Sequence, residues 1–136
     1  MPLYTRNDIL NAVAAAAKGL NARKEEINRL NVFPVPDGDT GTNMSLTLES
    51  VVTNIAKLPI GADGPSIRKA ITTGALMGAR GNSGVITSQI LRGLCEGTVN
   101  QDELNADSLD IAFSRAVEVA FQAVRKPVEG TILTVL

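Results

Sequence analysis

The segment that decides the fold is NVFPVPDGDTGTNM, residues 31–44. It places two aspartates around Gly38, adds a second glycine at 41, and then runs into an apolar stretch of helical period. Pro34 and Pro36 fix the backbone φ angle and stiffen the approach to this turn. The glycines permit backbone angles and close approaches that a side chain would block. Such a turn separates two helices, and its geometry suits holding a charged group better than filling a core.

Apolar residues recur at helical spacing over most of the chain, and convincing strand alternation is absent. Thr5 and Asp8 have capping-box spacing at the start of a first helix. A short polar helix at 22–30 is expected after a break at Asn21. These patterns predict about six helices and an all-α fold.

The second half of the chain continues this pattern. A glycine-broken turn, GARGNSG at 78–84, is expected to lead into a helix, and the last clear helix is expected to begin at Asp107 or Ser108. Its predicted inward-facing residues are Leu109, Ala112, Phe113, Ala116, Val117, Ala120 and Phe121. The final segment KPVEGTILTVL predicts a further helix beginning near Thr131. Because this segment stops on an apolar run, we expect one domain over 1–136 that is truncated at its C-terminal end.

Composition excludes several functional classes. The net charge of −1 and the 3% aromatic content argue against nucleic-acid binding. The chain has no histidine and one cysteine, Cys95, which rules out a Ser-His-Asp triad, an internal disulfide and a zinc-thiolate cluster. Without a signal peptide or a long apolar run, no membrane span is expected and the predicted location is the cytoplasm. Cys95 lies in an apolar helix and is expected to be a small core residue or a half-buried one.

The acidic loop suggests a cation site. Asp37 and Asp39 would repel each other in a pocket, and a hard cation such as magnesium or calcium would relieve that repulsion. The alternative is a polar turn in which Asp39 or Thr40 caps the following helix. A calcium EF-hand is a poor match, because Gly41, Thr42 and Leu48 stand where that motif needs other residues. Phe33 is expected to fill the core beneath the loop.

The second loop, GARGNSGVI at 78–86, suggests a phosphate site. It places Asn82 and Ser83 directly before a helix, whose N-terminal N–H groups favour anions. It is neither a Walker A loop, which would need a lysine, nor a dinucleotide fingerprint, which would need a preceding strand. A tight turn capped by Ser83 is an equally good interpretation of this loop alone. The two loops together favour a nucleoside triphosphate held with magnesium. Arg80 is expected either to reach a phosphate or to lie in solvent.

The segments LNVFPVPDGDTGTNM and GARGNSGVITSQ closely resemble the DhaL-type (dihydroxyacetone kinase L) nucleotide-binding domain. They are most similar to the N-terminal domain of the fatty-acid kinase ATP-binding subunit, and KPVEGTILTV is similar to a third segment of that branch. The resemblance implies an antiparallel helical barrel with ATP and magnesium at one end. The sugar-kinase branch has a further aspartate, where the nearest residue here is Asn31, and a histidine, where this chain has Thr40. These departures favour the fatty-acid branch.

The resemblance also assigns residues. It implies that Asp37 and Asp39 are the magnesium ligands and catalytic residues, with Asn31 as a further ligand. It places the phosphates against Thr40, Gly41, Thr42, Asn43, Asn82 and Ser83, and it places Thr131 near the nucleotide.

The sequence hypothesis is an ATP-dependent phosphotransferase that forms an acyl phosphate from a fatty acid presented by a separate carrier protein. Such an acceptor is already ionised at neutral pH and needs no general base. The first alternative is a dihydroxyacetone kinase L-like subunit. The second is a non-catalytic nucleotide-binding or interaction domain. A truncated barrel would also expose apolar surface, which predicts self-association, for example as a homodimer.

Overall fold

The computed structural model describes residues 4–99, 104–124, 128 and 130–136. Its six helices are α1 (Arg6–Leu30), α2 (Thr40–Ala56), α3 (Gly64–Gly78), α4 (Gly81–Gly97), α5 (Ala106–Ala123) and α6 (Ile132–Val135). Within these ranges there is no strand, and Tyr4 and Leu104 form an isolated antiparallel bridge. The predicted all-α fold is confirmed.

Helix α1 begins as its capping box predicts. The Thr5 N–H group donates to Asp8 Oδ2 (2.8 Å), and the Asp8 N–H group donates to Thr5 Oγ1 (3.3 Å). The predicted break at Asn21 is wrong, because α1 runs through this residue as one helix of 25 residues. Instead of capping a new helix, the Asn21 side chain accepts a hydrogen bond from Ser45 Oγ of α2 (3.3 Å). A tertiary contact thus overrides the local preference of asparagine for helix ends.

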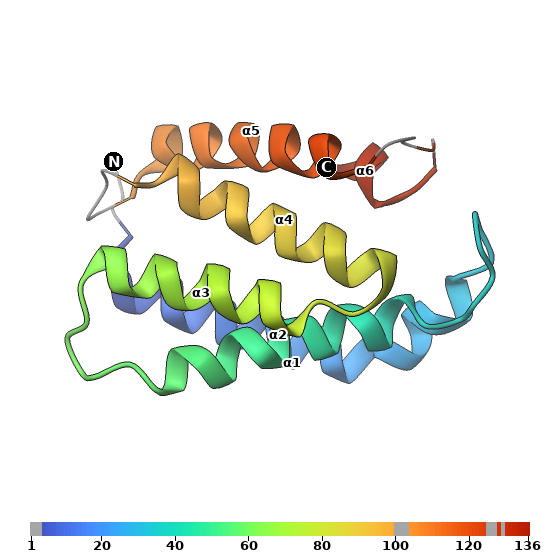
Figure 1. Ribbon diagram of the computed structural model, residues 1–136, viewed down its shortest axis with the longest axis horizontal. Helices are drawn as coiled ribbons and strands as arrows, with labels where there is room; N and C mark the ends of the chain where they lie inside the picture. Colours follow the sequence, from blue (N-terminus) through green and yellow to red (C-terminus); the bar gives the residue numbers. More distant parts are fainter. Residues whose placement is uncertain (1–3, 100–103, 125–127, 129) are drawn as a thin grey trace.

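Consecutive helices run antiparallel, and α2 and α4 are central in the arrangement (Figure 1). Helix α2 contacts α1, α3 and α4, whereas α4 also contacts α3 and α5. Val51 of α2 is fully buried at the centre of the core, where it lies with Ile67, Ile71 and Ala75 of α3 and Cys95 of α4. The expected core position of Cys95 is confirmed.

Small residues bring α4 and α5 close together. A Cβ atom at Gly97 would lie 2.6 Å from Ala112 Cα, and one at Gly93 would collide with the backbone of Ala116. This close approach selects the alanine face of α5 for burial. The prediction that Phe121 faces inward is wrong, because its side chain is 39% exposed. Phe113 is 51% exposed but borders the apolar cavity between the helices, so its predicted inward position is confirmed in part.

Two helix starts differ from the sequence prediction, and a third agrees with it. Helix α4 begins at Gly81, so Asn82 and Ser83 belong to its first turn and not to a preceding loop. Helix α5 begins at 106, one to two residues early, because Asn105 caps it by accepting a hydrogen bond from the Ser108 N–H group (2.9 Å). Helix α6 follows Thr131, its N-cap, as the terminal segment predicted. Residues 126, 127 and 129 of that segment lie outside the described residues.

A cavity of about 380 Å³ lies between α1, α3, α4 and α5. Its walls are mostly apolar, as in Leu91 and Ile71, and it is open to solvent on one side. In the part of the chain that the structure describes, we find no helix with both the length and the apolar character that a membrane span requires. The acidic loop at 31–39 lies at the end of the helices where α1 passes into α2 (Figure 1).

Candidate functional site

Asn31 organises the acidic loop. It is the C-cap of α1, and its Oδ1 accepts hydrogen bonds from the backbone N–H groups of Asp39 (3.1 Å) and Thr40 (3.3 Å). Its Nδ2 donates to the Val35 carbonyl oxygen (3.0 Å). Gly38 turns the chain back toward α2 with a φ of 67°, in the left-handed region that favours glycine. One asparagine thus ties the middle of the loop to its end.

The two aspartates leave their carboxylates uncommitted. Asp37 and Asp39 are both exposed, and neither carboxylate has a hydrogen bond or ion pair with any residue that the structure describes. Asp39 occupies the N-cap position of α2, but its side chain makes no capping hydrogen bond. Asp39 therefore has the N-cap position that the alternative interpretation predicted, but its side chain does not form the capping hydrogen bond.

The acidic loop does not form a closed metal cage. Within the described ranges, no group of three or more Asp, Glu or Cys side chains could hold an ion. Two free carboxylates nevertheless suit magnesium, which usually binds one or two carboxylates and completes its shell with water and phosphate oxygens. The oxygen ligand predicted at Asn31 accepts two backbone hydrogen bonds in this structure, so its use as a ligand would break or share them.

Asn28 is a residue of the site that sequence reasoning missed. Its Oδ1 accepts from the Thr42 N–H group (3.0 Å), and its Nδ2 donates to Thr42 Oγ1 (2.8 Å). The partner lies 14 positions further along the chain. No local pattern connects the two residues, because the contact exists only once α1 and α2 have packed.

The N-termini of α2 and α4 meet. Ser83 Oγ in the first turn of α4 donates to the Thr40 carbonyl oxygen in the first turn of α2 (3.1 Å). Gly81 lies so close to Asn43 that a Cβ atom there would collide with the amide of Asn43. A Cβ atom at Gly84 would lie 2.6 Å from Thr47 Oγ1. The two loops that the sequence singled out are therefore neighbours in space.

The first turn of α4 is open toward an acceptor. Its N-cap, Arg80, makes no side-chain capping bond. The backbone N–H groups of Gly81, Asn82 and Ser83 donate to no acceptor in the described part of the chain. The Arg80 side chain is exposed and donates to the carbonyl oxygens of Ala79 (3.1 Å) and Met77 (3.5 Å) at the end of α3. Free N–H groups at a helix N-terminus favour an anion such as phosphate.

The third segment comes close to the tip of the acidic loop. A Cβ atom at Gly130 would lie 3.8 Å from Phe33 Cε1, and Thr131 Oγ1 donates to the Val128 carbonyl oxygen (2.7 Å). The expectation that Phe33 fills the core is wrong, because the ring is 56% exposed. The loop projects past the ends of α1 and α2 (Figure 1), so no core lies beneath the ring.

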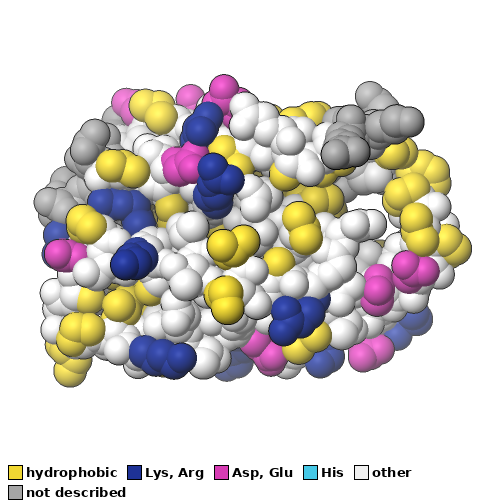
Figure 2. Space-filling view, viewed as in Figure 1, with side chains coloured by type: hydrophobic (Ala, Val, Ile, Leu, Met, Phe, Trp, Pro, Cys, Tyr) yellow, Lys and Arg dark blue, Asp and Glu magenta, His cyan; other side chains and the backbone are white. Residues whose placement is uncertain are grey.

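The end of the molecule that carries this loop has a mixed surface. Figure 2 shows hydrophobic side chains gathered there beside acidic ones. The exposed hydrophobic residues of the loop are Val32, Phe33 and Val35. Polar site groups therefore lie beside apolar surface.

The structure gathers most of the sequence-predicted residues. Thr40, Thr42, Asn43, Ser83 and Asn31 are linked by direct contacts between α1, α2 and α4. Gly41 lies against the backbone of Lys24. The side chains of Asp37, Asp39, Asn82 and Thr131 form no hydrogen bond with this group in the described residues.

An all-helical domain in which two helix N-termini meet beside free carboxylates defines a class suited to phosphate-bearing ligands. The chain belongs to the DAK2 domain family, whose model matches residues 34–136. This is a kinase-related family of DhaL-type nucleotide-binding domains, so the resemblance noted above is confirmed at the level of the family.

Two curated proteins are similar to this chain over most of its length. The chain is 48% identical over 127 residues to an uncharacterized protein of Staphylococcus haemolyticus (strain JCSC1435). It is 49% identical over 127 residues to an uncharacterized protein of Staphylococcus aureus (strain USA300). Each match covers 90% of this chain and 22% of the relative. The chain thus spans about a fifth of the length of the curated relatives it matches.

Proposed function

We propose that this chain is the nucleotide-binding part of a fatty-acid kinase, which phosphorylates a fatty acid presented by a separate carrier protein. The observation that supports it is the junction of α2 and α4, where Ser83 Oγ donates to the Thr40 carbonyl oxygen at 3.1 Å. This contact puts the acidic loop and the open first turn of α4 side by side. A cytoplasmic location and a homodimer belong to the same proposal.

In this proposal each loop binds one part of ATP with magnesium. Asp37 and Asp39 would hold the ion, and the N–H groups of Gly81, Asn82 and Ser83 would bind phosphate oxygens. The bound ion would neutralise phosphate charge, which is the main requirement of phosphoryl transfer. Phosphate contacts from the first turn of α2 (Thr40, Gly41, Thr42 and Asn43), ligation by Asn31 and a place for Thr131 near the nucleotide remain part of the proposal.

The chemistry needs no proton acceptor from the protein. A carboxylate oxygen of the fatty acid would form a bond to the γ-phosphorus, and the bond to the β,γ-bridging oxygen would break to release ADP. The carboxylate is ionised at neutral pH, so a chain without histidine can support this step by positioning and charge neutralisation.

A dihydroxyacetone kinase L-like subunit is the second candidate, favoured by the match to the DAK2 family. A hydroxyl acceptor must lose a proton on transfer, whereas a carboxylate does not. Supplying each acceptor with its own carrier protein separates the two functions. Binding of ATP without transfer to either acceptor would instead support a non-catalytic nucleotide-binding domain.

The direct test is Asp39→Ala in the protein assayed with a fatty acid, its carrier protein, ATP and magnesium. We expect magnesium-dependent acyl phosphate formation to fall below about 1% of wild type, because a lost metal ligand removes transition-state charge neutralisation. Asp110→Ala is the matched control, since Asp110 is exposed on α5 and outside the site. Wild-type turnover by the Asp39→Ala protein would refute the site.

A further inference from the structure

The start of α2 lacks a cap from its own N-cap residue. In α1, α3 and α5, the N-cap side chains of Thr5, Asp63 and Asn105 each accept a hydrogen bond from a first-turn N–H group. In α2 the N-cap is Asp39, whose short carboxylate could do the same and does not. The N-cap side chain of α2 therefore satisfies none of the N–H groups at the start of this helix.

Side chains at the C-terminal end of helix α1 supply this cap instead. Asn28 Oδ1 accepts from the N–H group of Thr42, the third residue of α2, at 3.0 Å. Its Nδ2 donates to Thr42 Oγ1 at 2.8 Å, so one amide holds the backbone and the side chain of the same residue. One turn further along, Asn31 Oδ1 accepts the N–H groups of Asp39 and Thr40. Asn28 of α1 and the C-cap residue Asn31 thus perform the N-cap function for α2.

We propose that Asn28 is a positioning residue that fixes the entry of α2 and leaves the Asp39 carboxylate free to bind a divalent cation. This inference rests on the proposed function, because the cation is the one that accompanies ATP. The contact between Asn28 and Thr42 is half-buried, whereas Asp39 is exposed. The carboxylate of Asp39, which solvent can reach, is therefore the group left available to a cation.

The test is calorimetric titration of the whole chain with ATP at several magnesium concentrations. For Asn28→Ala we expect the Kd for ATP with magnesium to rise at least about fivefold, because two hydrogen bonds that order the site are lost. The magnesium concentration needed for half-maximal binding should rise with it. Asn28→Asp keeps an acceptor for the Thr42 N–H group and should bind within about threefold of wild type.

Asn21→Ala is the matched control. Asn21 lies on the same helix and also bonds to α2, through Ser45 Oγ, but it is about two turns before Asn28 and farther from the loop. We expect it to lower thermal stability without changing the Kd or its magnesium dependence.

The outcomes separate the two claims. Wild-type protein that fails to bind ATP with magnesium overturns the proposed function and this inference together. Wild-type binding that persists unchanged in a folded Asn28→Ala protein overturns only the role of Asn28. If Asn28→Ala does not fold, the Asn28→Asp protein decides: strong loss of binding in that folded variant contradicts the inference, and retained binding supports it.

Discussion

Gly41 shows how single residues set distances at this site. It lies in the first turn of α2 against α1, and a Cβ atom there would collide with the carbonyl oxygen of Lys24 and lie 2.9 Å from Lys24 Cα. Both neighbouring atoms are backbone and belong to the middle of a long helix, so they cannot move aside cheaply. Glycine at this position therefore allows the contact between Asn28 and Thr42 to form.

We predict that Gly41→Ala destabilises the protein by roughly 1–3 kcal/mol, as expected when a tight contact is overpacked. Gly19→Ala is the matched control, because Gly19 lies inside α1 and a Cβ atom there meets nothing within 4 Å. That change should stabilise by roughly 0.5–1 kcal/mol through helix propensity. Urea denaturation of both variants measures the difference, and equal effects would contradict the packing at Gly41.

At the residue scale, the sequence predicted which residues lie close together, but it did not predict the hydrogen bonds that hold them there. The glycines and aspartates of the acidic loop were recognisable because their types are unusual together. Asn28 was not recognisable, because its bond to Thr42 depends on how two helices pack. Phe33 was misplaced because apolar character alone does not show that a loop projects away from the core.

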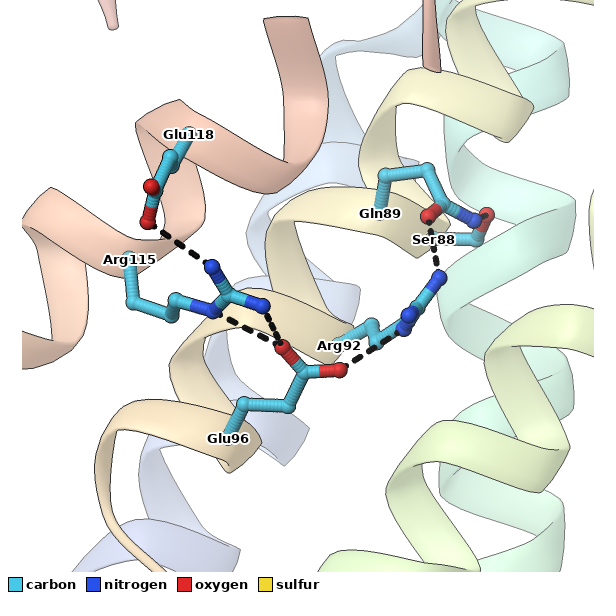
Figure 3. A network of polar contacts seen from close by, with 6 residues as sticks. All are labelled: Ser88, Gln89, Arg92, Glu96, Arg115 and Glu118. Atoms are coloured by element: carbon cyan, nitrogen blue, oxygen red, sulfur yellow. Dashed lines mark hydrogen bonds and ion pairs between the residues drawn. The ribbon is translucent and has the colours of Figure 1, made fainter. Parts of the chain in front are cut away.

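At the scale of elements, a polar network joins α4 to α5 (Figure 3). Glu96 accepts from Arg92 on its own helix (2.9 Å) and from Arg115 of α5 (2.8 Å), and Arg115 also pairs with Glu118 (2.8 Å). Partial burial tends to raise the pKa of Glu96, but hydrogen bonds and charge from Arg115 and Arg92 outweigh it and lower the pKa below its ordinary value. The network thus stabilises the α4–α5 contact in a pH-dependent way.

The sign of this dependence follows from the lowered pKa. Glu96 contributes stability above its unfolded-state pKa of about 4.3, and the contribution is lost as pH falls through the lower folded-state value. We predict that Glu96→Gln is less stable than wild type at pH 7 and that the difference shrinks at pH 3. Urea denaturation at both pH values measures it. Glu49→Gln, which alters an exposed side chain of α2, should show no such convergence.

Local sequence signals predicted where a helix starts more accurately than they predicted where it ends or which of its faces is buried. The capping box of Thr5 and Asp8 identified the start of α1, because its hydrogen bonds are local. The break at Asn21 was wrong because α2 offered that side chain a partner. The inward position of Phe121 was wrong because the close contact of Gly93 with Ala116 places the alanine face of α5 against α4.

At the scale of the whole molecule, the reactivity of the Cys95 thiol reports on the packing of the core. The thiol is buried beside the apolar cavity, and this burial raises the pKa of Cys95. Because the thiolate is the reactive form, a buried neutral thiol reacts slowly with disulfide reagents.

We predict that labelling of Cys95 by a disulfide reagent at pH 8 is at least about a hundredfold slower in native protein than in urea, because the thiol must become exposed and ionised. The denatured protein is its own control. Rapid stoichiometric labelling of the native protein would contradict the packing of α4 against the core.

The family of the chain and its all-α fold could both be predicted from two motifs and helical periodicity. The acceptor could not be predicted, because the N–H groups and carboxylates near the α2–α4 junction would suit phosphate and a cation in many phosphotransferases and carry no information about the acceptor. The central claim is therefore narrower than the choice of acceptor: the free carboxylates of Asp37 and Asp39 bind the cation that holds a triphosphate.

Calorimetric titration with ATP, in magnesium and then in excess chelator, tests this claim most directly. The account predicts binding in magnesium, no binding in chelator, and loss of the magnesium-dependent binding in Asp37→Asn/Asp39→Asn protein that melts like wild type. Equal affinity for ATP with and without magnesium, or unchanged binding by the doubly substituted protein, would contradict it.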